Sequence, residues 1–280
     1  MSLPKPTLAL TSLHLALLVL AGCTSGDAAP SGTKQAPRME HIHGIDVDPA
    51  DGDVYVGTHH GLFRVDDDGP ELVGGHGQDF MGFTVAGPGH FLASGHPGEG
   101  QGGPGSVGLI ESTDAGETWS EVSLGGGADF HALEYRHDRV YGLNSMTGQL
   151  LVSEDQENWE ELTRTLMADF AVDPGSPDAL IATTQGGLAR STDSGRTFEV
   201  LSDAPLLVLV SWADDGTVVG VTPEGAVYLA EDPAGEWTER GRLPGHPEAL
   251  TAISASEIYA AAVGKVMRSK DEGTTFSELG

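Results

Sequence analysis

The sequence predicts an all-β, six-bladed β-propeller with four-stranded antiparallel blades, because one turn motif recurs through the chain at the spacing of such blades. The clearest copies are STDAGETW at 112–119, STDSGRTF at 191–198 and SKDEGTTF at 269–276. Weaker copies begin at 65, 153 and 230, so successive copies lie 47, 41, 38, 39 and 39 residues apart. The six repeats account for residues 39–280 as one domain.

The first repeat shows how each blade is expected to fold. Strands at 43–48, 53–58, 62–65 and 71–74 alternate with turns at 49–52, 59–61 and 66–69. Consecutive antiparallel strands reverse direction, so the turn after the second strand shares a face with the link to the next blade. This face, called the top face here, also holds the starts of the innermost strands. These are expected near His43, Met81, His131, Ala168, Leu207 and Leu250.

The repeated turn has residues suited to a tight hairpin. Short Ser and Asp side chains accept hydrogen bonds from the amides of their own turn, and Gly supplies a positive φ at little cost. The motif resembles the Asp-box, or BNR, repeat of sialidases, sortilin-type receptors and photosystem II assembly factors. In those families the boxes are structural and lie away from the active face. The resemblance implies that Asp114, Asp193 and Asp271 are turn residues.

Residues 1–22 are predicted to be a lipoprotein signal peptide. Lys5 is the only charge before an apolar run at 8–20, which ends in Leu-Ala-Gly directly before Cys23. This junction resembles the bacterial lipobox and implies that Cys23 is lipidated. Residues 23–38 then form the lipidated cysteine and a flexible tether rich in Gly, Ser, Pro and Ala. We expect an extracytoplasmic protein anchored by lipid to the bacterial cell membrane.

The chain is strongly acidic, with a formal net charge of −28 and a pI near 4.4. A surface of this charge repels phosphate backbones and anionic headgroups. The composition therefore argues against nucleic-acid binding. Cys23 is the only cysteine, which excludes an intramolecular disulfide.

The histidines are concentrated on the predicted top face. Only two of the ten that follow the signal peptide, His90 and His137, are expected on the opposite face. The eight expected on the top face are His41, His43, His59, His60, His76, His96, His131 and His246. Residues at equivalent positions of neighbouring blades converge on the mouth of the central channel, so this bias predicts a binding site there.

The residues at this mouth suit a metal ion. His43, Met81 and His131 align at the starts of three innermost strands, and His59 and His96 occupy equivalent turns. Imidazole is a ligand for zinc, copper and nickel, and an added thioether favours copper. We predict a copper or zinc ion, or a small ligand, bound by His41, His43, His59, Met81, His96 and His131. Asp79 and Asp129 are candidate partners that orient the histidines.

A glycoside hydrolase is the main alternative. Bacterial lipoproteins similar to this chain, which share its HIHG, THHG and DFHAL segments, are labelled sialidase-like glycosyl hydrolases. That resemblance implies a glycan substrate, for which Asp79 and Asp129 are the candidate catalytic carboxylates. A true sialidase is expected to have an early Arg-Ile-Pro segment and a tyrosine nucleophile, whereas this chain has HIHG early and its tyrosines lie within predicted strands. The third class is a non-enzymatic scaffold or assembly factor that binds a protein on its top face.

Overall fold

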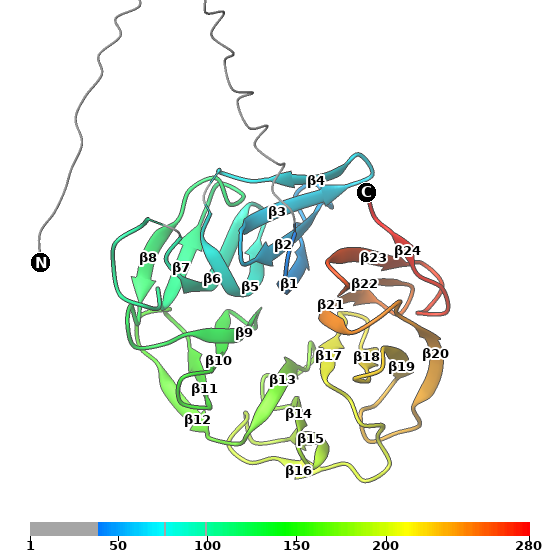
Figure 1. Cartoon of the computed structure of the whole chain (residues 1–280). Coiled ribbons are helices and arrows are strands. Elements are labelled where there is room, and N and C mark those ends of the chain that lie inside the picture. Colours follow the sequence, from blue (N-terminus) through cyan, green and yellow to red (C-terminus); the bar gives the residue numbers. More distant parts are fainter. Residues whose placement is uncertain (1–38, 76, 99) are drawn as a thin grey trace, which may run out of the picture. The chain divides into compact units, whose positions relative to one another are not determined.

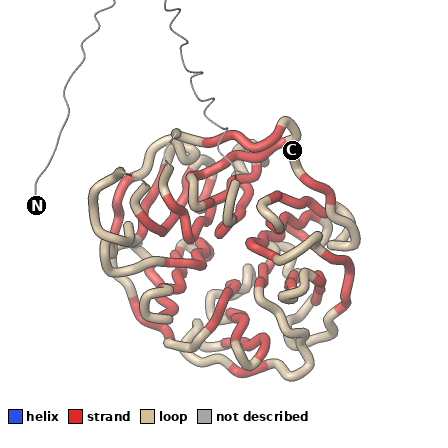
Figure 2. The backbone as a smooth tube through the Cα atoms, in the orientation of Figure 1, coloured by secondary structure: helices blue, strands red, loops and turns tan. Residues whose placement is uncertain are grey.

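A computed structural model describes residues 39–280 except residues 76 and 99, and this part of the chain is a six-bladed β-propeller (Figure 1). The predicted signal peptide, Cys23 and the predicted tether lie outside the described residues, as does His76. Each blade is a four-stranded antiparallel sheet, and the rest is loop and turn (Figure 2). No helix in the described part is long and apolar enough to cross a membrane. The predicted fold class is confirmed.

The blades follow one another in chain order. The first three contain β1 (Ile42–Val47), β2 (Val54–Thr58), β3 (Gly61–Asp66) and β4 (Gly69–Leu72); β5 (Asp79–Gly87), β6 (His90–His96), β7 (Leu109–Ser112) and β8 (Ser120–Ser123); and β9 (Phe130–Arg136), β10 (Arg139–Asn144), β11 (Gln149–Ser153) and β12 (Glu160–Thr163). The last three contain β13 (Met167–Val172), β14 (Leu180–Thr184), β15 (Gly187–Ser191) and β16 (Glu199–Val200); β17 (Leu209–Trp212), β18 (Val218–Val221), β19 (Ala226–Ala230) and β20 (Thr238–Arg242); and β21 (Pro247–Ser254), β22 (Glu257–Ala262), β23 (Lys265–Ser269) and β24 (Ser277–Glu278).

The ring closes by packing between the first and last blades, because every sheet is built from four consecutive strands. Ile42 and Ile45 of β1 share an apolar cluster with Ala249 and Tyr259 of the last blade. Glu248 adds a polar link, since its carboxylate accepts the N–H of Ile42 at 3.4 Å. The first and last blades are therefore joined without exchange of a strand.

The innermost strands begin close to the predicted residues, at 42, 79, 130, 167, 209 and 247. The largest difference is in the last blade, where β21 starts at Pro247, three residues before Leu250. Glu248 therefore lies at the start of this strand, where Leu250 was expected.

The repeated turns form the hydrogen bonds that their residues favour. In the turn after β7, the amide of Gly116 donates to Ser112 Oγ at 2.9 Å, and Ser112 Oγ donates to Asp114 Oδ1 at 2.8 Å. Thr118 Oγ1 donates to the other oxygen of Asp114 at 2.6 Å. The turns that contain Asp193 and Asp271 repeat this pattern. These three aspartates bond within their own turns, on the face opposite the top face.

Side chains of the innermost strands join each blade to the next. In every junction an oxygen atom accepts a backbone N–H from the neighbouring innermost strand. The pairs are Asp46 with Val85, Thr84 with Tyr135, Glu134 with Val172, Asp169 with Val210, Ser211 with Ala252, and Glu248 with Ile42. This ring of polar links fixes the innermost strands around the channel, on which the site below depends.

Close packing between blades predicts one large effect of a small substitution. A Cβ atom at Gly82 of β5 would lie 2.5 Å from the carbonyl oxygen of Phe130 in the next blade. Gly82→Ala is expected to destabilise the protein by about 1–3 kcal/mol, because backbone must shift to accept the methyl group. Gly87→Ala, in the same strand, is the control, since nothing lies within 4 Å of its Cβ. Urea unfolding of both variants measures the difference, and equal midpoints would refute the tight blade contact.

Candidate functional site

β-bulges place the predicted site residues at the top of the innermost strands. Ile42 pairs with Thr58 and Gly44 with Gly57, which leaves His43 between them as the extra residue of β1. Shifts of the same kind leave Met81, His131, Ala168 and Glu248 unpaired in four other blades. A bulge re-aims the side chain of the extra residue. In the strand registers, His43, Met81 and His131 thus occupy equivalent positions.

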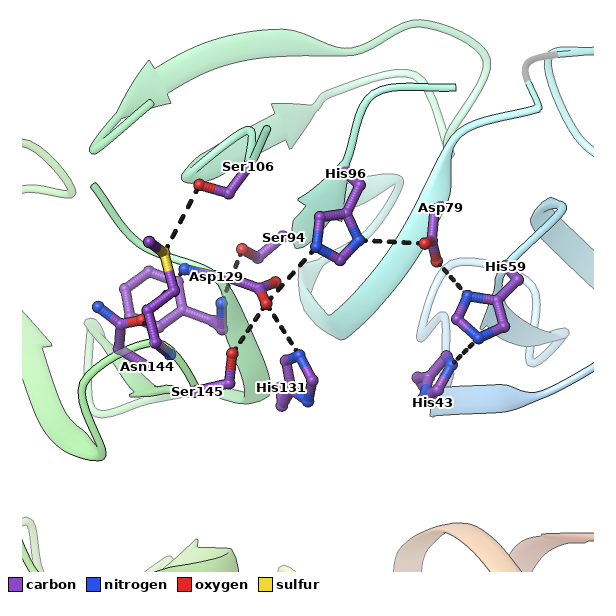
Figure 3. A network of polar contacts seen from close by, with 12 residues as sticks. His43, His59, Asp79, Ser94, His96, Ser106, Asp129, His131, Asn144 and Ser145 are labelled. Carbon is purple, nitrogen blue, oxygen red and sulfur yellow. Dashed lines mark hydrogen bonds and ion pairs between the residues drawn. The ribbon is translucent and has the colours of Figure 1, made fainter. Parts of the chain in front are cut away.

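Six side chains from the first three blades form one continuous polar network (Figure 3). Imidazole and carboxylate groups alternate along most of it, in the order His43, His59, Asp79, His96, Asp129 and His131. His59 lies in the turn between β2 and β3, and His96 at the end of β6. The network therefore joins strand starts to strand ends across two blade junctions.

Asp79 fixes the orientation of two histidines. Its Oδ1 lies 2.6 Å from His59 Nδ1, and its Oδ2 lies 3.1 Å from His96 Nδ1. Because a carboxylate only accepts, each Nδ1 donates its hydrogen to Asp79. The Nε2 atom of neutral His59 is then left with a lone pair, and it faces His43 Nε2 at 3.2 Å. The ring of His41 packs edge-on against His59, with centroids 5.1 Å apart.

His43 is held in the neutral state. Burial, together with the neighbouring His59, lowers the pKa of His43 to about 4. At neutral pH its ring therefore retains a lone pair that a cation or a hydrogen-bond donor can use.

Asp129 is the buried carboxylate of the network, with 6 % of its surface exposed. Its Oδ2 accepts from Ser145 Oγ at 2.8 Å and from His131 Nε2 at 2.9 Å, while His96 Nε2 lies 3.6 Å away. Burial raises the pKa of Asp129, but hydrogen bonds from His131 and Ser145 outweigh it and the net pKa is lowered. A glycosidase general acid needs the opposite shift, so Asp129 is poorly suited to that role.

The remaining predicted top-face residues lie apart from this network. Met81 is buried, with 7 % of its surface exposed. His60 Nε2 lies 3.7 Å from Glu40, and His246 Nδ1 contacts the carbonyl oxygen of Pro247 at 3.0 Å. Of the top-face histidines, His41, His43, His59, His96 and His131 are gathered. Among residues 39–280, omitting 76 and 99, no group of three or more His, Cys, Asp or Glu side chains is positioned so that it could hold a metal ion, so a metal site here requires some of these rings to turn.

A cavity of about 770 Å³ continues from the network into the central channel. His43, His131 and Glu248 line it, together with Glu134 and Asp169. Burial raises the pKa of both Glu134 and Asp169 to about 7. The sequence did not lead us to Glu134, Asp169 or Glu248. An acidic residue inside an otherwise apolar innermost strand is a signal that could have identified them.

Comparison with known proteins identifies the fold but no family. No family model and no curated protein matches the chain. Among solved structures, the nidogen/laminin complex matches with a TM-score of 0.65 at 9 % identity, over 81 % of this chain and 92 % of that chain. The GH74 xyloglucanase from Xanthomonas campestris gives 0.55 at 17 % identity, over 86 % of this chain and 45 % of that one. Virginiamycin B lyase from Staphylococcus aureus gives 0.55 at 15 % identity, over 86 % and 85 %.

These neighbours share a propeller and little else. They include a glycoside hydrolase, a lyase and a protein solved in complex with laminin. Identities this low establish the fold alone, and a fold of this kind carries many functions. The chain is therefore a six-bladed β-propeller whose chemistry has to be inferred from its own top-face residues.

Proposed function

We propose that this protein binds a transition-metal ion, zinc or copper, at the top mouth of its channel, with His43 and His59 as ligands. One observation carries the proposal. The Nε2 atoms of the two rings face each other at 3.2 Å, while Asp79 holds the opposite nitrogen of His59 at 2.6 Å.

The separation of the two nitrogens fits a shared ion. Nitrogen ligands at roughly 2.0–2.1 Å around a tetrahedral metal lie about 3.3 Å apart. A carboxylate on the far nitrogen of a ligand histidine is the usual partner of such a site, because it fixes the tautomer and raises ligand basicity. The His59 and Asp79 pair has this arrangement.

His41 is the third ligand of the proposed centre. Its ring already packs against His59, and its side chain is exposed and can turn toward the ion. In the metal-free protein the Nε2–H of His43 donates to His59 Nε2, and the ion takes the place of this hydrogen when His43 changes tautomer and carries its proton on Nδ1. The remaining coordination position faces solvent, where a small ligand can bind. Imidazole ligands favour zinc or Cu(II), and Met81 is not part of this ligand set.

The proposal includes the predicted lipid anchor at Cys23. Acylation there would keep the metal site outside the cytoplasm and close to a membrane surface. A glycan or a partner protein at the same face would bind next to the ion.

Zinc analysis after equilibrium dialysis tests the proposed centre. His59→Ala is expected to lose one equivalent of tightly bound zinc relative to the wild-type protein. His90→Ala is the matched control, because His90 lies on the opposite face and pairs with Glu111 at 2.7 Å. It is expected to retain all the zinc. Equal zinc contents in wild type and His59→Ala, with both proteins folded by circular dichroism, would refute the proposal.

A further inference from the structure

The second half of the network contains a gap between two polar atoms. His96 donates from Nδ1 to Asp79 Oδ2 at 3.1 Å. Its other ring nitrogen, Nε2, faces Asp129 Oδ2 at 3.6 Å, which is beyond hydrogen-bond distance. These two atoms therefore face each other without a direct hydrogen bond.

Asp129 provides a second, independent observation. Its other oxygen, Oδ1, is buried and has no hydrogen-bond partner among the described residues. A buried carboxylate oxygen left without a donor is costly and is rare in folded proteins. Ser145 holds this carboxylate in place, since its Oγ donates to Oδ2 at 2.8 Å and its amide donates to the Asp129 carbonyl oxygen at 2.9 Å.

We propose that His96, Asp129 and His131 form a second metal centre, separate from the one at His43 and His59. The distances from Asp129 Oδ2 to His131 Nε2 and His96 Nε2 are 2.9 and 3.6 Å. They bracket the separation of about 3.3 Å between ligands of a tetrahedral ion. The imidazole side chains of His96 and His131 are 39 % and 41 % exposed, so both rings can turn onto the ion while Asp129 stays fixed.

Two histidines and one carboxylate leave the remaining coordination positions open. Sets of three protein ligands with an open position are typical of metal ions that take water or a substrate as a further ligand. Asp79 contacts one histidine of each centre, His59 and His96, and so orients a ligand in both. The second centre extends the proposed function, but its three ligands are not shared with the first.

Zinc stoichiometry of five proteins separates the two centres. The wild-type protein is expected to bind two equivalents of zinc after dialysis. His131→Ala and His59→Ala are each expected to bind one, and the double variant none. His90→Ala is expected to keep both. His131 is the chosen position because it is exposed, whereas removal of the buried Asp129 endangers folding. Unfolding curves confirm that each variant is folded, and His96→Ala replaces His131→Ala if the latter is not.

Each other outcome overturns a defined part of the proposal. One equivalent in the wild type that survives in His131→Ala overturns the second centre and leaves the first. One equivalent that disappears in His131→Ala but not in His59→Ala overturns the first centre and keeps the second. Zinc that is retained in both single variants, or absent from the wild type, overturns both. Substitution with Co²⁺ gives a further readout, since each occupied four-coordinate centre contributes its own visible absorption.

Discussion

Asp79→Asn is expected to weaken zinc binding by about 10–100-fold at one or both of the two proposed centres. Asp79 accepts from His59 Nδ1 and His96 Nδ1 with different oxygens. An asparagine side chain has only one accepting oxygen, and its amide group repels the second Nδ1–H. At least one histidine must then turn away or change tautomer, and its Nε2 is lost as a ligand. Competition with a chromophoric zinc chelator measures the affinities.

Asp51→Asn is the control for this experiment. It removes the same unit of negative charge from an exposed turn between β1 and β2, on the opposite face. A general effect of net charge on cation affinity would appear in both variants. Equal affinities of Asp79→Asn and Asp51→Asn at both centres would show that Asp79 does not orient the ligands.

Asp169→Asn is expected to gain about 2–4 kcal/mol of stability relative to wild type as the pH rises from 4 to 8. Burial raises the pKa of Asp169 to about 7 in the folded protein, against about 3.9 in an unfolded chain. Between these values the folded state binds more protons than the unfolded state. The wild type therefore loses stability as the pH rises from about 4 to about 7, and the loss is complete above that.

Asparagine is uncharged and retains one oxygen to accept the N–H of Val210. It loses the hydrogen bond that the other oxygen of Asp169 accepts from the N–H of Phe170, and this cost is the same at every pH. Urea unfolding at pH 4, 6 and 8 measures the free energy of unfolding of both proteins. Asp51→Asn again controls for the removal of one charge from a protein of net charge −28. A difference between Asp169→Asn and wild type that does not change with pH would show that Asp169 is ionised in the folded channel.

The fold could be predicted because its determinants are local and repeated. The Ser, Asp and Gly residues at 112–118 satisfy one another within a single turn, and five such steps along the chain set the length of a blade. Neither feature depends on distant residues. The strand starts could therefore be predicted to within three residues, and the prediction differed most at β21.

The site could be predicted in outline only. Equivalent positions in successive blades identified His43, His59, His96 and His131, since strand register transfers from blade to blade. His59 and His60 are adjacent in sequence, yet only His59 points into the network, and the thioether of Met81 is buried apart from it. A choice between neighbouring turn residues depends on how the next blade packs, which spacing does not encode.

The sequence by itself determined the number of blades, the chemistry of the turns and the face on which the histidines gather, because each depends on periodicity and strand direction. Only the tertiary structure decided that Asp79 joins two histidines 37 residues apart and that Asp129 loses its contact with water. It also decided that Glu134 and Asp169 share the channel with raised pKa values. These properties arise from distances and desolvation between blades, and they exist only after the ring has closed.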